Sequence, residues 1–139
     1  MIVLDTNVVL EQMKIDSEPR VQAWLDNQND ADVWLTVITA AELQSGVEKL
    51  FPGEKRISLQ AQVSAILDED FIDRILPFDL DAALVYAEIA GRRLRSQRRI
   101  HTMDYQMAAI ARVYGASVAT RNIRDFEGLG IDLIDPWAA

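Results

Sequence analysis

The chain has 139 residues, of which half are hydrophobic, and a formal net charge of −8. It is long enough to bury the core of one domain, and its lack of cysteine excludes disulfides, thiolate catalysis and cysteine-bound zinc. The acidic charge argues against binding nucleic acid or anionic membrane through bulk charge alone. No apolar stretch approaches the roughly 18 residues of a membrane span, so we expect a cytoplasmic protein without membrane association.

Short apolar strand patterns alternate with helical patterns along the whole chain. In chain order the expected elements are a strand at 2–4, a helix at about 6–13, a helix from 19 through 25, a strand at 33–37, a helix from 40 to about 50, a helix at 54–68, a strand at 74–78, a helix from 80 to about 95, a helix at 102–114, and strands at 116–120 and 131–134. Pro77 would disrupt a central strand, which places 74–78 at an edge of the sheet. This alternation predicts a single α/β domain, a three-layer α/β/α sandwich around a mostly parallel central sheet.

Three acids fall where strands end or helices begin. Asp5 follows the first strand, Glu42 comes shortly after the second, and Asp104 opens the helix at 102–114. In parallel sheets the ligand crevice lies beyond the carboxyl ends of the strands, so these acids could share one edge of the sheet. Carboxylates are hard oxygen ligands for Mg²⁺ or Mn²⁺, and like charges at close range resist joint ionisation unless a cation neutralises them.

Each of these acids also has a local explanation. Asp5 can cap the first helix by accepting from its unpaired amides. Thr39 and Glu42 have the spacing of a capping box, in which Glu42 reaches back to the backbone of Thr39. Thr102 can cap the later helix and leave Asp104 as an acid that complements its dipole. The occurrence of all three acids together favours a shared site over three separate caps.

The segment TRNIRDFEG at 120–128 adds further candidates directly after a predicted strand. Asp125 could join the acidic site, and Asn122 could contribute a carbonyl or hold a water; alternatively, both are ordinary turn residues that bond nearby backbone. Arg121 and Arg124 are candidates for phosphate contact because guanidinium forks match phosphate geometry. Their alternative role is to pair with the acids themselves.

Five arginines and no acid occur in RRLRSQRR at 92–99, which is unusual in an acidic protein. The segment is either a solvated helix end, where cations complement the dipole, or a site of phosphate contact. The only histidine, His101, could act as a general base, but a helix-start or surface position is the interpretation we favour.

An ordered set of motifs covers essentially the whole chain. Its members are DTN at 5–7, TAAEL at 39–43, MDYQMAAIA at 103–111, ATRN at 119–122 and DF at 125–126. Together they resemble the PIN-domain family, and within it the VapC-type toxins of bacterial toxin–antitoxin modules. The strand at 74–78 and the DPW at 135–137 resemble the FitB-like branch in particular.

This resemblance implies a Mg²⁺- or Mn²⁺-dependent endoribonuclease that hydrolyses tRNA or other structured RNA. It further implies a homodimer that is neutralised by a small VapB- or FitA-like antitoxin, with operator DNA contacted only through that antitoxin. One alternative is a weakly catalytic or non-catalytic binding module that acts with a DNA-binding antitoxin in autoregulation. Another is a structural domain whose acids only cap helices.

The resemblance also implies roles for the acids. Asp5 and Asp104 would bind the metal directly, whereas Glu42 would bind it through water or orient the nucleophile. Many relatives have an acid where this chain has Asn122. Either Asp125 takes over that role, or the site uses three carboxylates with Asn122 as a weaker ligand.

Polar residues next to these acids are expected to support the site or contact RNA. Thr6 and Asn7 would hold the first acid and its loop in place, and Thr120 could bond an acid or a water. The full set of expected supporting and substrate-binding residues is Thr6, Asn7, Thr120, Arg121, Asn122 and Arg124.

Overall fold

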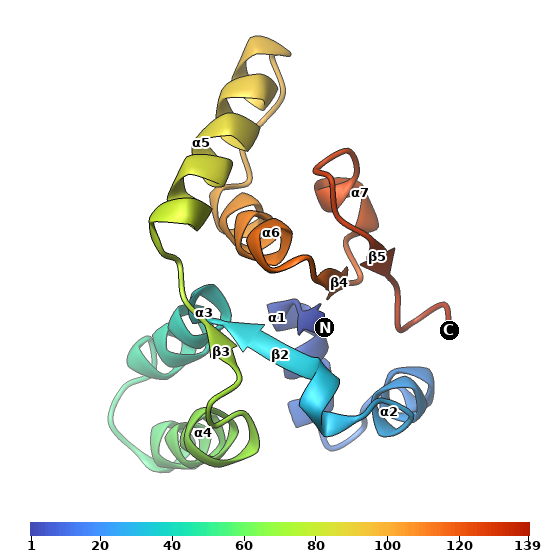
Figure 1. Ribbon diagram of the computed structural model, residues 1–139. Coiled ribbons are helices and arrows are strands. Elements are labelled where there is room, and N and C mark those ends of the chain that lie inside the picture. The colour runs from blue at the N-terminus through green and yellow to red at the C-terminus, as the bar shows by residue number, and fades with distance from the viewer.

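The computed structural model describes residues 1–139 and contains one five-stranded sheet (Figure 1). Its strands are β1 (Ile2–Leu4), β2 (Val33–Thr36), β3 (Ile75–Leu76), β4 (Ser117–Ala119) and β5 (Leu133–Ile134). They lie in the order β3-β2-β1-β4-β5, and every neighbouring pair is parallel. The predicted parallel sheet is therefore confirmed, with β1 at its centre and the proline-containing segment at an edge.

Seven α-helices connect and cover these strands. They are α1 (Thr6–Met13), α2 (Pro19–Asp26), α3 (Val37–Glu48), α4 (Glu54–Ala65), α5 (Leu80–Arg95), α6 (Thr102–Tyr114) and α7 (Ile123–Phe126). A 3-10 turn, η1 (Asp30–Asp32), precedes β2, and a π-helical turn, η2 (Ile66–Asp70), extends α4. None of the helices combines the length and the apolarity that crossing a membrane requires.

The sheet has a hydrophobic core on each face. Val3 and Val118 belong to a cluster formed largely with α5, α6 and α7, whereas Leu4 and Ala119 belong to a second cluster with α1 to α4. Successive side chains of a strand point to opposite faces, so two residues of β1 serve two cores. The helices consequently form a layer on either side of the sheet, as Figure 1 shows, which confirms the three-layer prediction.

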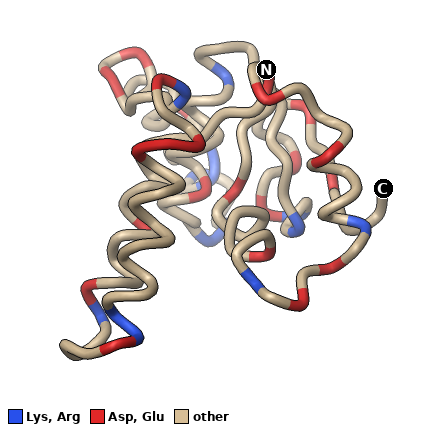
Figure 2. Tube along the Cα trace, turned by 90° about the horizontal axis from the view of Figure 1, so that it is seen from below, with Lys and Arg blue, Asp and Glu red and all other residues tan.

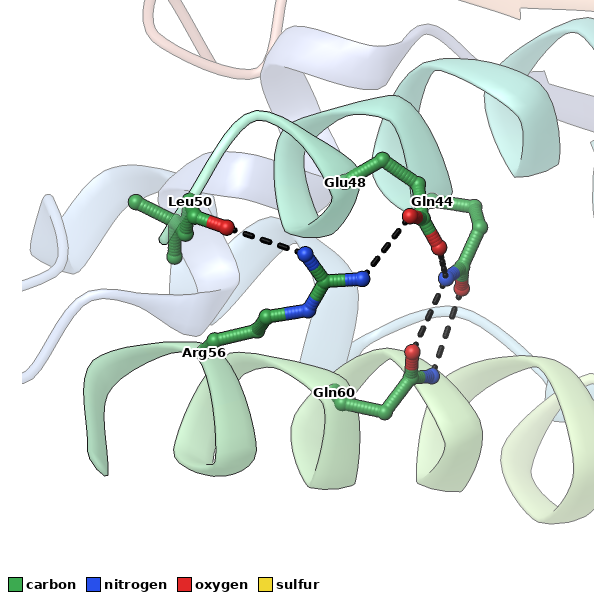
Figure 3. A network of polar contacts seen from close by, with 5 residues as sticks. All are labelled: Gln44, Glu48, Leu50, Arg56 and Gln60. Carbon is green, nitrogen blue, oxygen red and sulfur yellow. Dashed lines mark hydrogen bonds and ion pairs between the residues drawn. The ribbon is translucent and has the colours of Figure 1, made fainter. Parts of the chain in front are cut away.

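A polar network ties α3 to α4 (Figure 3). The Arg56 guanidinium donates to the Leu50 carbonyl at 3.0 Å and to Glu48 Oε2 at 2.8 Å. The amides of Gln44 and Gln60 bond each other in both directions, at 2.8 and 3.3 Å. Most of these groups are partly or fully exposed, so we assign the network to fixing the angle between the two helices and expect it to contribute little to stability.

Two of the caps considered as local alternatives do not form. The helix expected from residue 40 begins at Val37, because Thr36 at the end of β2 caps it by accepting from the Thr39 amide at 3.3 Å. Glu42 therefore lies beyond the first turn, and the capping box with Thr39 does not form. In the other case, Thr102 does not cap α6, since His101 occupies the N-cap position without a side-chain hydrogen bond.

Other differences concern element ends. The helix expected over 54–68 is α-helical only to Ala65 and then widens into the π turn η2. The short helix α7 occupies a segment for which no element is predicted. It follows the strand β4 after three residues and turns the chain back towards α6, with Phe126 buried in the core beside it.

Candidate active site

The candidate site lies beyond the carboxyl ends of the central strands. Asp5 directly follows β1, and its amide donates to the Ala119 carbonyl at 2.9 Å, which joins the ends of β1 and β4. Thr36 ends β2 and starts α3, the helix that carries Glu42. The two remaining acids come from the first turn of α6 and from α7. The topology thus delivers side chains from distant parts of the sequence to one edge of the sheet, as expected for parallel strands.

Asp5 is the most deeply placed acid of the site, with only 4% of its surface exposed. Its Oδ1 accepts from the Thr6 amide at 2.7 Å, and its Oδ2 accepts from the Thr120 hydroxyl at 2.7 Å. Burial raises the pKa of this carboxyl, the charge of Asp125 raises it further, and the two hydrogen bonds partly oppose the rise. Asp5 is the N-cap of α1 as well, so the cap and site positions coincide.

Glu42 is held by a chain of hydroxyl groups. The Thr6 hydroxyl donates to Glu42 Oε1 at 2.9 Å and lies 3.0 Å from the Thr39 hydroxyl. Because Thr6 has one hydroxyl proton and gives it to Glu42, Thr39 is the donor to Thr6. Burial and the charge of Asp5 both raise the pKa of Glu42. One carboxylate oxygen of Glu42 is thereby fixed, and the other makes no hydrogen bond within the protein.

Asp104 and Asp125 complete the group of acids, together with His101. One ligand atom from each of these three side chains lies within 4.8 Å of the other two, and His101 Nε2 is 3.8 Å from Asp125 Oδ1. The pKa of Asp104 is raised to about 6, chiefly by burial and also by the charges of Asp5, Asp125 and Glu42, while His101 opposes the rise. The four carboxylates therefore lie close enough to repel one another.

The two candidates in the 120–128 segment separate in space. Asp125 faces the acid group, whereas Asn122 is exposed and its side chain makes no hydrogen bond to cap α7. The Asn122 amide instead donates to the Thr120 hydroxyl at 2.9 Å, so its backbone helps to hold the threonine that binds Asp5. This geometry favours Asp125 over Asn122 as the fourth acidic-site residue.

The remaining expected residues lie around the rim. The Arg121 amide donates to Asn7 Oδ1 at 3.4 Å, and the Arg121 guanidinium sits 5.1 Å from the centre of the Trp137 ring. Neither Arg121 nor Arg124 forms an ion pair, so the alternative that they neutralise the acids is wrong. Both guanidinium groups are exposed and free to meet an anionic ligand.

His101 is a site residue that the sequence analysis does not place near the acids. It is at a helix start, as predicted, and it is also close to two acids of the site. Its position three residues before Asp104 could have suggested this, because residues three apart on a helix share a face. Its approach to Asp125 depends on how α6 and α7 pack, for which the sequence has no local signal.

The donor set of this site fits a hard divalent cation. Its acids are wholly or partly buried, and no lysine or arginine lies within 4.0 Å of any of their oxygens. Clustered carboxylates without a compensating charge are unfavourable, and a cation removes the penalty. Carboxylate oxygens are the ligands typical of Mg²⁺ and Mn²⁺. Asp5, Glu42, Asp104 and Asp125 are the residues that could hold such an ion.

We expect Thr120→Val to destabilise the protein by about 1–3 kcal/mol at neutral pH, because it leaves a buried Asp5 oxygen without its donor. Urea unfolding of the metal-free protein measures this change. Thr120→Ser keeps the hydroxyl and is the matched control, for which a much smaller loss is expected. Equal losses for both variants would contradict the role of the hydroxyl.

Comparison with known proteins adds independent information. The family model of the PIN domain matches residues 2–130. The chain is 39% identical over 137 residues to the VapC ribonuclease Y4jK of Sinorhizobium fredii, which covers 99% of this chain and 98% of the relative. It is 37% identical to the toxin FitB of Neisseria gonorrhoeae, with 99% of each protein covered.

A solved structure shares the fold as well. FitAB bound to a DNA fragment contains a chain that matches with a TM-score of 0.90 at 36% identity, over 99% of this chain and 96% of that chain. The similarity therefore extends over nearly the whole length of both chains. On the match of the family model to residues 2–130 and on these full-length relatives, the chain belongs to the PIN-domain family.

Proposed function

We propose that this protein is a divalent-metal-dependent endoribonuclease and the toxin of a toxin–antitoxin pair. The observation that carries the proposal is the group of four carboxylates, Asp5, Glu42, Asp104 and Asp125, at the sheet edge, with no lysine or arginine paired to any of them. The ribonuclease and toxin names of full-length relatives support the same function. Its substrate class is tRNA or other structured RNA in the cytoplasm.

Each acid has a role that follows from its environment. Asp5 and Asp104 are the proposed direct ligands, Asp5 because it is fixed at both oxygens and Asp104 because the charges of all three other acids raise its pKa. When bound, Mg²⁺ or Mn²⁺ polarises a water and stabilises the charge that develops on the phosphate. Glu42, held at one oxygen by Thr6, has its second oxygen free to orient a nucleophilic water.

Around these acids, other side chains keep the geometry or meet the substrate. Thr6 and Thr120 hold Glu42 and Asp5, and Asn7 joins the turn that carries Arg121. Preorganised groups of this kind need no rearrangement when the reaction begins. Arg121 and Arg124 are exposed at the rim, where guanidinium groups can contact phosphates of the substrate.

We expect purified protein to cleave total RNA with Mg²⁺ or Mn²⁺ and to lose this activity in excess EDTA. Denaturing gel electrophoresis over a time course measures the cleavage, and restored activity after adding back the metal excludes irreversible damage by the chelator. Cleavage that persists unchanged in EDTA, or that is absent with every divalent metal, would contradict the proposal.

A second candidate function is a binding module that acts with a DNA-binding antitoxin in autoregulation. The solved relative bound to a DNA fragment is the observation that favours it. Growth arrest upon expression separates the two functions: a nuclease requires the acids, so Asp104→Asn should abolish the arrest. Unchanged arrest would favour the binding module. Either function includes a VapB- or FitA-like antitoxin and a homodimer, and sedimentation of the purified chain tests the dimer.

A further inference from the structure

The positive charge of this acidic protein is concentrated in one segment. Residues 92–124 contain eight of the 14 lysines and arginines but only one of the 22 acids. Over the rest of the chain acidic positions outnumber basic ones, and they are spread along the trace (Figure 2). An RNA molecule is therefore repelled by most of the surface, and attraction has to come from this segment.

Four arginines of this region line one cavity next to the candidate active site. The cavity has a volume of about 140 Å³ and is lined by Arg93, Arg98, Arg99 and Arg124, together with His101 and Asp125. We call it the arginine cleft. His101 and Asp125 also belong to the group of acidic-site residues, so the cleft and the acids share a wall.

The backbone holds the cleft in shape. After α5 ends, Gln97 adopts a left-handed conformation with φ of 57°, and the Arg98 amide donates to the Arg93 carbonyl at 3.0 Å. The Tyr105 hydroxyl then donates to the Arg99 carbonyl at 3.2 Å. This turn reverses the chain between α5 and α6 and presents Arg98 and Arg99 beside α7.

One arginine of the cleft is fixed, and three are available. Arg93 donates to the Glu127 carbonyl and lies 5.6 Å from the centre of the Tyr105 ring. Arg98, Arg99 and Arg124 are exposed and form no ion pair with any acid. By contrast, two arginines just outside the cleft are paired with one glutamate, at 3.7 and 3.8 Å, namely Arg92 and Arg112 with Glu88.

We propose that the arginine cleft binds a backbone phosphate of the RNA next to the one that is cleaved. This inference rests on the proposed function and extends it to how the substrate is held. Guanidinium forks match phosphate oxygens, and three unpaired forks around one cavity form a site for that group. An acidic polypeptide is the competing ligand. RNA is favoured because the cleft shares a wall with the acid group, so an RNA strand whose scissile phosphate lies at the acids can place a neighbouring phosphate in the cleft.

The test measures how RNA binding depends on salt. Metal-free protein is titrated into fluorescein-labelled bulk tRNA in EDTA, so that bound RNA is not cleaved, at several KCl concentrations. The full-length variant carries Arg98→Gln, Arg99→Gln and Arg124→Gln. We expect its affinity at 100 mM KCl to fall about tenfold or more, and its log–log salt slope to flatten by about 0.7–0.9 for each phosphate that the variant no longer binds.

A matched control removes the same charge elsewhere. Lys14→Gln, Lys49→Gln and Lys55→Gln together alter three exposed cations that do not line the cleft and should leave the salt slope unchanged. Arg98→Lys, Arg99→Lys and Arg124→Lys keep the charge but lose the forks, so an intermediate affinity is expected. Circular dichroism melting of every variant verifies that the proteins remain folded.

Defined outcomes overturn the inference. It is wrong if the wild type shows no tRNA binding at 50 mM KCl, or if the cleft variant and the control lose affinity and slope equally. It is also wrong if labelled poly-L-glutamate binds the wild type as tightly as tRNA and loses the same affinity in the cleft variant. Cleavage of RNA by the wild type is assayed separately, so a failed nuclease assay with an intact cleft effect refutes only the proposed function.

Discussion

Asp5→Asn should reduce metal-dependent RNA cleavage by about 10²- to 10³-fold while the protein remains folded. Asparagine has the shape of aspartate, and its carbonyl oxygen can still accept from the Thr6 amide that Asp5 binds at 2.7 Å. On the other side, the Thr120 hydroxyl can rotate to accept from the new amide instead of donating to a carboxylate. What the variant loses is the negative charge that would bind the cation.

The control for this variant is another buried acid near the end of the same helix. Glu11 is only 7% exposed, pairs with Lys14 at 3.3 Å and belongs to none of the contacts of the acid group. Glu11→Gln should therefore leave the cleavage rate within about threefold of the wild type. Cleavage by Asp5→Asn at a rate similar to that of Glu11→Gln would refute the metal role of Asp5.

The gathering of Asp5, Glu42 and Asp104 could be predicted from the sequence because one topological rule governs it. Asp5 and Glu42 follow strands, and Asp104 opens the helix that leads into the strand at 116–120; in a parallel sheet the ends of strands and the starts of such helices lie at the same edge. The strand patterns near 2–4, 33–37 and 116–120 are strong. The polar environment of the acids could not be predicted in the same way. The hydrogen bond from Thr6 to Glu42 spans 36 residues, and no local pattern encodes it.

The wrong capping box shows why local patterns mislead at this site. Thr39 and Glu42 have the spacing of a box, but Thr36 caps the helix three residues earlier, where β2 runs into α3 without a loop. The β-branched residues at 37–39 look like strand and are helical, since packing against the sheet overrides their propensity. Glu42 is thereby freed from a capping role and is available to the site.

The part played by Asp125 and His101 depends on a segment that has no periodic signal. The helix α7 has four residues, too few to show a repeat of 3.6, yet it turns Asp125 inward and leaves Asn122 outside. The sequence could therefore name both residues as candidates without choosing between them. The contact of His101 with Asp125, at 3.8 Å between residues 24 positions apart, follows from the same turn.

The repulsion within the group of acids leads to a second prediction: the variant Asp104→Asn should be more stable than the wild type in the absence of metal. The folded-state pKa of Asp104 is about 6, above its ordinary value of 3.8, because burial and three neighbouring acids disfavour its charge. The folded protein therefore binds more protons than the unfolded chain between these two values, and its stability falls as the pH rises through this window. Above pH 6 the full cost of the charge is present.

Asp104→Asn removes this cost, so we expect it to raise the free energy of unfolding at pH 7.5 in EDTA. A shift of this size corresponds to about 3 kcal/mol at most, and because Asp104 is only half buried, solvent screening reduces the expected gain to about 1–2 kcal/mol. Thermal unfolding should show a Tm increase of several degrees at pH 7.5 and almost none at pH 4, where the wild-type carboxyl is protonated.

Divalent metal should reverse the order of stability of the wild type and Asp104→Asn. A cation that binds only the folded protein stabilises it in proportion to the logarithm of its concentration over Kd, and it binds best where all four acids are intact. Millimolar Mn²⁺ should therefore raise the Tm of the wild type and change that of Asp104→Asn much less. Two results would contradict the metal role of Asp104: a lower Tm of Asp104→Asn in EDTA, or an equal response of both proteins to Mn²⁺. Either result would mean that Asp104 stabilises the dipole of α6 as a first-turn acid, because the loss of that stabilisation at neutral pH does not depend on a cation.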